Sequence, residues 1–238
     1  MKKISKEKIL NSLKKYSTEF ALIFISVILA FALTEWSANR GEKVSENKIL
    51  GEIKNGIKSD YKDFESNLKM HKISKSGVGE LRKWVNNQEI NNDSIPVYYF
   101  LVFRNYSPII NKTGYESLKG TNLKTISNDS LRFQIIKLYD YHYNIIEQLE
   151  NHNEEMQDFK NYFAPINEIL SPYMNFDEKG ILTGLNPANL SSTQKKELLS
   201  YLWRLDITKM FKILRYEQVL KEIETLEKSL DKELKNDS

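Results

Sequence analysis

The side chains best suited to chemistry are three histidines, His71, His142 and His152, and the glutamates around the last two. Histidine and glutamate together can bind zinc or iron, so their spacing decides whether a metal site is expected. His142 and His152 are ten residues apart, which is about 15 Å along a helix, and they form neither an H-E-x-x-H nor an E-x-x-H motif. The segment therefore predicts an exposed acidic helix face. No cofactor or metal is predicted.

Other catalytic motifs are also missing from the sequence. It contains no G-x-S-x-G nucleophile motif, no Walker phosphate loop and no G-x-G-x-x-G fingerprint. The acids Asp129, Asp177 and Glu178 lack the spacing of a calcium loop and are expected in a helix cap and a loop. The absence of cysteine excludes disulfides and thiolate chemistry. The sequence therefore predicts a protein that is not an enzyme, with a hydrolase or metal enzyme that uses His142 or His152 as the alternative.

A group of aromatic residues offers a different kind of site. Its members are Tyr98, Tyr99, Phe100, Phe103, Tyr106, Tyr139, Tyr141 and Tyr143. Such rings can line a ligand pocket, but at helical spacing they belong more often to a hydrophobic core. The core is the preferred interpretation, and the pocket is the alternative.

An uncharged apolar run at residues 20–34 indicates how the chain is located relative to a membrane. Tyr16 and Trp36 bracket it twenty positions apart, which is about 30 Å along a helix, and interfacial aromatics are expected at that separation. We therefore divide the chain into a cytoplasmic lysine-rich head (1–15), a transmembrane helix (16–38) and an extracytoplasmic domain (39–238).

Charge predicts the orientation of this span in the membrane. Residues 1–19 hold six lysines and two glutamates, a net charge of +4, and the whole chain is +3, so the remainder sums to −1. The positive-inside rule places the N-terminus in the cytoplasm and the main domain in the periplasm, anchored in the inner membrane. Because the basic charge lies in the head, the pI near 8.7 does not indicate nucleic-acid binding.

A cleaved signal peptide is the alternative to an anchor. The lysine-rich start, the short apolar run and the Ala30-Phe31-Ala32 triplet fit such a segment. The anchor is preferred because helical periodicity resumes just beyond Trp36. On the alternative, the chain is a secreted helical protein.

The main domain is predicted to be an all-α, antiparallel helical bundle with long helices. Nine glycines and five prolines in 238 residues favour long elements, and apolar residues recur at helical spacing over 42–71. That stripe is expected to pack within its own domain, with a short dimeric coiled coil as the alternative. A Lys/Ser/Gly patch over 72–79 is expected to separate it from a short helix reaching Val85.

Further helices are expected along the rest of the chain. The apolar run 97–103 resembles a strand but has no partner strand, so a buried helix is predicted. A short helix follows at Thr113–Lys119, ended by Gly120, and Ser127 or Asn128 caps a helix that continues towards Tyr162. An irregular stretch over 164–190 precedes the last helical region. The apolar residues expected along its stripe include Leu202, Trp203, Ile207, Met210, Phe211, Leu214 and Leu220.

Two blocks of sequence resemble an uncharacterised family of small bacterial single-span membrane proteins. The first is Glu19, the apolar run, Trp36, Asn39 and Arg40, similar to a span that ends in an Asn-Asn-Trp-Asn-like sequence and an arginine. The second is Tyr115 to Gly120 followed by Asn128, Leu131 and Arg132, similar to an E-x-L-K turn and a helix opening with N-x-x-L-R. The resemblance implies a retained anchor and a helical extracytoplasmic domain, with no assigned activity.

The expected function is binding. Glu116 and Arg132 are predicted to pair and fix the angle between two helices. Beyond the lipid bilayer, a protein partner or a second copy of the chain is expected, so that the domain binds a partner or scaffolds a complex. A ligand-sensing domain that signals through a separate membrane partner is the alternative.

Overall fold

The computed structural model describes residues 6–236, with side chains described for residues 16–235. About 82% of the chain is helical and two short strands occur among the described residues, which confirms the all-α prediction. The chain forms two compact units, an N-terminal unit (Met1–Lys48) and a C-terminal unit (Ile49–Ser238). The side chains of the lysine-rich head, residues 1–15, lie outside the described part.

The described part of the N-terminal unit is helical, because α1 (Lys6–Val85) begins there. The apolar side chains of residues 20–34 are exposed, and the helix is long and apolar enough to cross a membrane. The hydroxyl of Ser26 donates to the carbonyl of Leu22 at 2.7 Å, and that of Thr34 to the carbonyl of Ala30 at 2.8 Å. These bonds satisfy the two hydroxyl groups within the helix itself.

Helix α1 does not break at the Lys/Ser/Gly patch, contrary to the prediction, and runs without interruption to Val85. The reason lies in the packing around Gly77. A Cβ atom at this position would lie 2.9 Å from the Cβ of Tyr98 and 2.9 Å from Cγ2 of Val102, both in α2 (Ile95–Val102). The glycine therefore permits a close approach between two helices instead of ending one.

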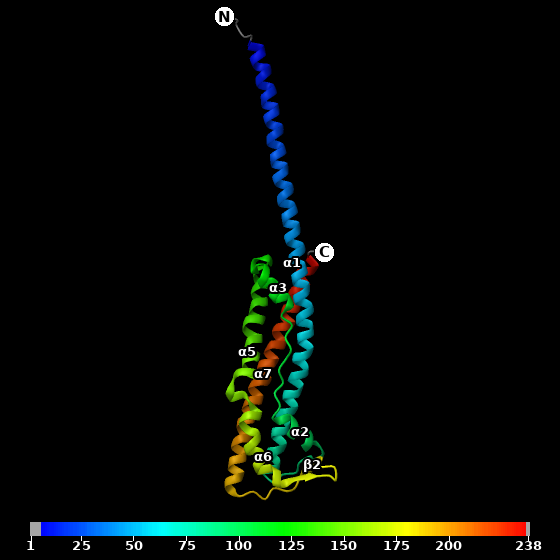
Figure 1. Ribbon diagram of the computed structural model, residues 1–238, viewed down its shortest axis with the longest axis vertical. Coiled ribbons are helices and arrows are strands. Elements are labelled where there is room, and N and C mark those ends of the chain that lie inside the picture. The colour runs from blue at the N-terminus through cyan, green and yellow to red at the C-terminus, as the bar shows by residue number, and fades with distance from the viewer. Residues whose placement is uncertain (1–5, 237–238) are drawn as a thin grey trace. The chain divides into compact units, whose positions relative to one another are not determined.

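Three long helical segments form the framework of the described C-terminal unit (Figure 1). They are α1 from Ile49 onward, α7 (Ser192–Asn236), and a rod composed of α4 (Asp129–Ile136), η3 (Lys137–Tyr143), α5 (Asn144–Glu147) and η4 (Gln148–His152). η3 and η4 are π-helical. Lys54 pairs with Asp231 at 2.5 Å, whereas Lys75, further along α1, pairs with Asp206 at 2.7 Å. From the first pair to the second, the residue number rises along α1 and falls along α7, so these two helices are antiparallel.

The apolar stripe of α1 packs into the core of its own unit. Ile53, Ile57 and Phe64 have no exposed surface and contact residues of the rod and α7 in one hydrophobic cluster. Phe64 lies between Tyr143 and Tyr216, with ring centroids 5.4 Å away on each side. The preferred interpretation, packing within the domain, is therefore confirmed over a coiled coil through this stripe.

The rod ends earlier than predicted, at His152 instead of near Tyr162. Asn153 has an extended backbone (φ −77°, ψ 108°), and its side chain accepts a hydrogen bond from the amide of Glu155. This arrangement competes with helix continuation. The chain then forms the 3-10 turn η5 (Glu154–Met156), the π-helix η6 (Phe159–Phe163) and α6 (Ala164–Leu170).

A second hydrophobic cluster joins the C-terminal part of α1, α2, α6 and the start of α7 to a β-hairpin. The hairpin lies within the stretch predicted to be irregular and consists of β1 (Met174–Phe176) and β2 (Leu182–Leu185), paired antiparallel. Asp177 accepts hydrogen bonds from the amides of Lys179 and Ile181, and Gly180 adopts a positive φ of 76°, so both residues build its turn. Two 3-10 turns, η1 (Asn92–Ser94) and η7 (Ser171–Tyr173), flank these elements.

The short helices agree with the predictions in type but not in every detail. Residues 97–102 are helical within α2 and Phe103 is its C-cap, yet Val97 and Phe100 are exposed. Helix α3 (Thr113–Thr121) passes through Gly120, which does not end it, and is followed by η2 (Leu123–Thr125). Asn128 caps α4 by accepting from the amide of Leu131, as predicted.

Glu116 and Arg132 do not pair. Arg132 forms an ion pair with Asp129 at 2.6 Å and donates to the carbonyl of Ile126 at 2.9 Å, while Glu116 lies 3.9 Å from Lys119. Each pair joins two residues three positions apart on one helix, Arg132 with Asp129 and Glu116 with Lys119, and side chains at this spacing are neighbours on a helix surface. Arg132 therefore links α4 to the turn before it, and no contact to Glu116 fixes the angle between the helices.

Candidate functional site

Helix α7 has its polar and apolar faces reversed between Ile207 and Leu214, and Trp203, one turn earlier, is also exposed. The apolar residues on the outer face are Trp203 (58% exposed), Ile207 (37%), Met210 (43%) and Leu214 (56%), hereafter the α7 stripe. The buried face of the same turns carries Thr208, Lys209 and Lys212. The prediction that these four apolar residues share one stripe with Leu202 and Leu220 is therefore wrong, because Leu202 and Leu220 are buried.

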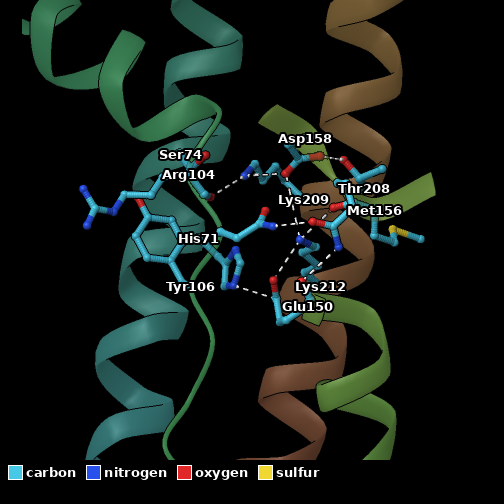
Figure 2. A network of polar contacts seen from close by, with 12 residues as sticks. His71, Ser74, Arg104, Tyr106, Glu150, Met156, Asp158, Thr208, Lys209 and Lys212 are labelled. Carbon is cyan, nitrogen blue, oxygen red and sulfur yellow. Dashed lines mark hydrogen bonds and ion pairs between the residues drawn. The ribbon is translucent and has the colours of Figure 1, made fainter. Parts of the chain in front are cut away.

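The buried lysines of α7 belong to an ionic network that joins three parts of the chain (Figure 2). Its members, hereafter the ionic network, are His71 from α1, Glu150 from η4, Asp158, Lys209 and Lys212, and none of their side chains is exposed. Lys209 Nζ lies 2.7 Å from Asp158 Oδ2, and Lys212 Nζ lies 2.9 Å from Glu150 Oε2. The two cations are thus matched by two carboxylates.

His71 is the fifth member of the network. Its Nε2 lies 3.2 Å from Glu150 Oε1. Burial lowers the pKa of His71, and the neighbouring Lys209 and Lys212 lower it further, although Glu150 opposes them. His71 is therefore neutral at pH 7, and the network carries no net charge.

Two charged members of the network, Lys209 and Glu150, have shifted pKa values. Burial lowers the pKa of Lys209, with Asp158 opposing it. Burial would raise the pKa of Glu150, but His71 and Lys212 outweigh it, and the pKa is lowered. A buried charge is stable only while its partner is present, so the members of this network depend on one another.

The ionic network lies on the same face of α7 as the buried Leu202, Leu205 and Tyr216, and together they fix the rotation of the helix about its own axis. A residue two positions away on a helix lies about 200° around it, that is, on the opposite face. Lys209 and Lys212 face inward to reach Asp158 and Glu150, and this turns Ile207, Met210 and Leu214 outward. The exposure of these apolar side chains therefore accompanies the inward position of the two lysines.

The α7 stripe has the geometry of a helix-pairing seam. Its four residues follow at intervals of four, three and four, which is the spacing of the a and d positions of a heptad repeat. They extend over about 16 Å of helix. Phe211, half-buried at the edge of the stripe, carries the guanidinium of Arg215 over its ring at 5.1 Å. An amphipathic helix with an apolar seam is complementary to such a surface.

The histidines of the predicted acidic face are separated by the fold. His142 is buried with Nε2 3.6 Å from Glu222 Oε1, whereas His152 is exposed at the end of η4. Among the described residues, no group of three histidine or acidic side chains is placed to hold a metal ion. Glu150, expected on an exposed face, is instead buried in the ionic network.

The aromatic group divides between core and surface. Phe103, Tyr106, Tyr139 and Tyr143 are buried, as the core interpretation predicts. Tyr99, Phe100 and Phe103 also line a pocket of about 570 Å³ near the hairpin, as the alternative interpretation predicts. Tyr16 and Trp36 lie at the two ends of the apolar run, both exposed, with the Arg40 guanidinium 5.6 Å from the Trp36 ring.

Sequence reasoning missed the ionic network, although one signal for it was present. Thr208, Lys209 and Lys212 continue the spacing of the buried Leu202 and Leu205 towards Tyr216. Polar residues that keep the spacing of a buried stripe indicate that they have polar partners in the core. Here the partners are the carboxylates of Asp158 and Glu150, which lie some 50 to 60 positions away along the chain. No local pattern identifies those partners.

Comparison with known proteins provides no functional assignment. No model of a protein family, no curated protein and no solved structure matches this chain.

Proposed function

We propose that this chain is a single-span membrane protein whose C-terminal antiparallel helical bundle binds an amphipathic helix of a partner protein through the α7 stripe. The reversed faces of α7 are the observation that carries the proposal. Four large apolar side chains stand exposed at heptad spacing, and the charges that hold them outward are fully buried. Contiguous apolar exposure of this kind marks interaction surfaces.

The proposed location follows from the apolar part of α1. That helix is long and apolar enough to cross a membrane, and its exposed apolar side chains suit a lipid environment. The lysine-rich start of the sequence supports an N-terminus in the cytoplasm and a C-terminal unit in the periplasm of a bacterial cell. A retained anchor tethers the C-terminal unit to the membrane and raises the effective concentration of the α7 stripe towards other anchored proteins.

The proposal assigns the domain a binding role and no catalytic one. The exposed side chains of the α7 stripe are an indole, two aliphatic chains and a thioether, which bury well but transfer no proton. A second copy of this chain and a different protein both offer helices of the required chemistry.

Site-directed crosslinking in native membranes tests the proposal and separates these two sources. Because the chain has no cysteine, Met210→Cys provides one site for a photoreactive thiol reagent. We expect a crosslinked product from Met210→Cys, whose mass is twice that of the chain for a second copy and another value for a different protein. Lys124→Cys, at an exposed position in η2, is the matched control.

Equal yields of product from the two positions, or no product from Met210→Cys, would contradict the proposal. Mass spectrometry of the same material also reports whether residues 1–32 remain attached. Their absence would favour the secreted alternative over the anchor.

A further inference from the structure

An aromatic pocket of about 570 Å³ lies between α2, η6 and the hairpin. This volume is within the range of small-molecule sites, about 300–1,000 Å³. Its aromatic lining consists of Tyr99, Phe100, Phe103, Phe159, Phe163 and Phe176. Phe100, Phe159 and Phe176 are 57–61% exposed, so the pocket opens to solvent over large apolar side chains. Exposure of several phenylalanines around one cavity is costly unless a ligand covers them.

The local sequence builds one wall of this pocket through a widened helical turn. Pro165 has no amide N–H and cannot donate the bond that an α-helix directs to the carbonyl of residue 161. The turn before it is the π-helix η6, and π turns inside helices occur often at functional sites. In this turn Phe159 and Phe163 stack with ring centroids 4.7 Å apart, and Phe163 meets Phe103 edge-on at 5.4 Å.

Arg104 is the only charged residue of the lining. Its guanidinium lies 4.9 Å from the centroid of the Phe100 ring, and Figure 2 shows it directed away from the ionic network. No carboxylate forms an ion pair with it among residues 16–235. Its carbonyl accepts a hydrogen bond from Lys209 Nζ at 3.4 Å, so the ionic network fixes the backbone from which it extends.

We propose that this pocket binds an anionic amphiphile, with an acyl chain against the phenylalanine rings and a carboxylate or phosphate head group on Arg104. Arginine matches the planar oxygens of either head group and can donate two hydrogen bonds to it. The rings remain apolar partners for the chain. This ligand is independent of the helix proposed for the α7 stripe.

The polar groups of the pocket favour an acyl chain over a peptide. The hydroxyl of Tyr99 already donates to Oδ1 of Asn167, and Arg104 supplies the only other side-chain donor of the aromatic and charged lining. A peptide would bury backbone amides without partners there, which is unfavourable. An acyl chain has no such groups.

Photolabelling of the full chain in nanodiscs of zwitterionic lipid tests this assignment. The probe is a fatty acid with a diazirine on its chain, and labelled peptides are mapped by mass spectrometry. We expect labels in residues 95–104 and 159–182, removed by excess dodecanoate or dodecyl phosphate but not by dodecanol. Labelling of the apolar run 20–34 reports access of the probe to the bilayer and provides an internal reference.

Arg104→Gln is expected to reduce pocket labelling about 10- to 100-fold, as loss of a charge-assisted hydrogen bond implies, and to leave the label in the apolar run unchanged. Arg215→Gln is the matched control, because Arg215 also lies over a phenylalanine ring, at 5.1 Å, but outside the pocket. Labelling of the apolar run alone would overturn the proposal. Equal competition by dodecanol, or loss of pocket label in both variants, would overturn the role of Arg104. Competition by dodecyl phosphate alone, or by dodecanoate alone, would identify the head group.

Discussion

Lys209 and Asp158 form one of the two buried ion pairs of the ionic network. Both side chains are fully buried, and their atoms approach to 2.7 Å. We expect Lys209→Met to lower the free energy of unfolding by about 3–5 kcal/mol, because it leaves a buried carboxylate without its partner. The double variant Lys209→Met/Asp158→Leu should recover most of that loss, since it removes both charges. Thermal unfolding of the full chain in one detergent, followed by circular dichroism, measures both effects.

The exposed Lys228→Met is the control for the same measurement and should change the stability by less than about 0.5 kcal/mol. If the double variant were as unstable as Lys209→Met, the pairing of these two charges would not explain the loss.

The raised pKa of the buried Asp60 makes the stability of the fold depend on pH. Burial raises its pKa to about 6 from 3.8, although it accepts hydrogen bonds from the amide of Asn111 and the hydroxyl of Tyr143. A raised folded-state pKa favours the protonated form, so Asp60 stabilises the fold fully below pH 3.8, and this contribution is lost as pH rises through 6. By linkage the loss is about 3 kcal/mol. His71 has the opposite sign, because its lowered pKa makes it destabilising as pH falls below 6.5.

Asp60→Asn isolates the contribution of this carboxyl. The amide stays neutral, so we expect the stability of the variant relative to the wild type to increase between pH 4 and pH 6 and to stay level above that. Tm values of both proteins across this range provide the measurement. A difference that does not change with pH would show that Asp60 ionises normally in the folded chain.

At the scale of elements, two glycines of α1 are expected to respond differently to an added methyl group, because only one of them contacts another helix. A Cβ at Gly77 would meet Tyr98 and Val102 of α2 at 2.9 Å, whereas one at Gly51 would have nothing within 4 Å. We expect Gly77→Ala to destabilise the fold by about 1–3 kcal/mol through overpacking. Gly51→Ala should stabilise it by about 0.5–1 kcal/mol, because alanine favours a helix. Thermal unfolding of both variants is the test, and effects of the same sign would contradict the packing of α2 on α1.

Local sequence signals predicted some elements and not others, for physical reasons. The cap at Asn128 and the apolar run 20–34 depend on neighbours in sequence, and both follow from composition and spacing. The continuity of α1 through Gly77 depends on the close approach of α2. The spacing of residues in the sequence does not reveal that contact. The hairpin was missed because its strands are only three and four residues long.

Helix α7 shows most clearly why the candidate site could not be predicted. Periodicity alone assigns Ile207, Met210 and Leu214 to the core, because apolar residues are normally buried. The burial of Lys209 and Lys212 depends on carboxylates from distant segments, so the rotation of the helix is decided by tertiary pairing.

At the scale of the whole molecule, the proposed topology predicts which parts of the chain are accessible from outside the cell membrane. Lys196→Cys, at an exposed position of α7, should react with an impermeant maleimide in intact spheroplasts. Lys8→Cys should react only after lysis, because the lysine-rich head is expected in the cytoplasm. Labelling of Lys8→Cys in intact spheroplasts would contradict the proposed orientation.

The binding of a partner helix by α7 is tested on the full-length chain taken from its own membrane. Native gel electrophoresis of gently solubilised membranes measures the size of the complex that contains the chain. We predict that the wild type and the control Lys124→Glu migrate in a complex larger than the monomer. Met210→Glu/Leu214→Glu, which places charges on the α7 stripe but leaves the ionic network intact, should migrate as the monomer with an unchanged Tm. Migration of this variant in the same complex as the wild type would contradict a binding role for the α7 stripe.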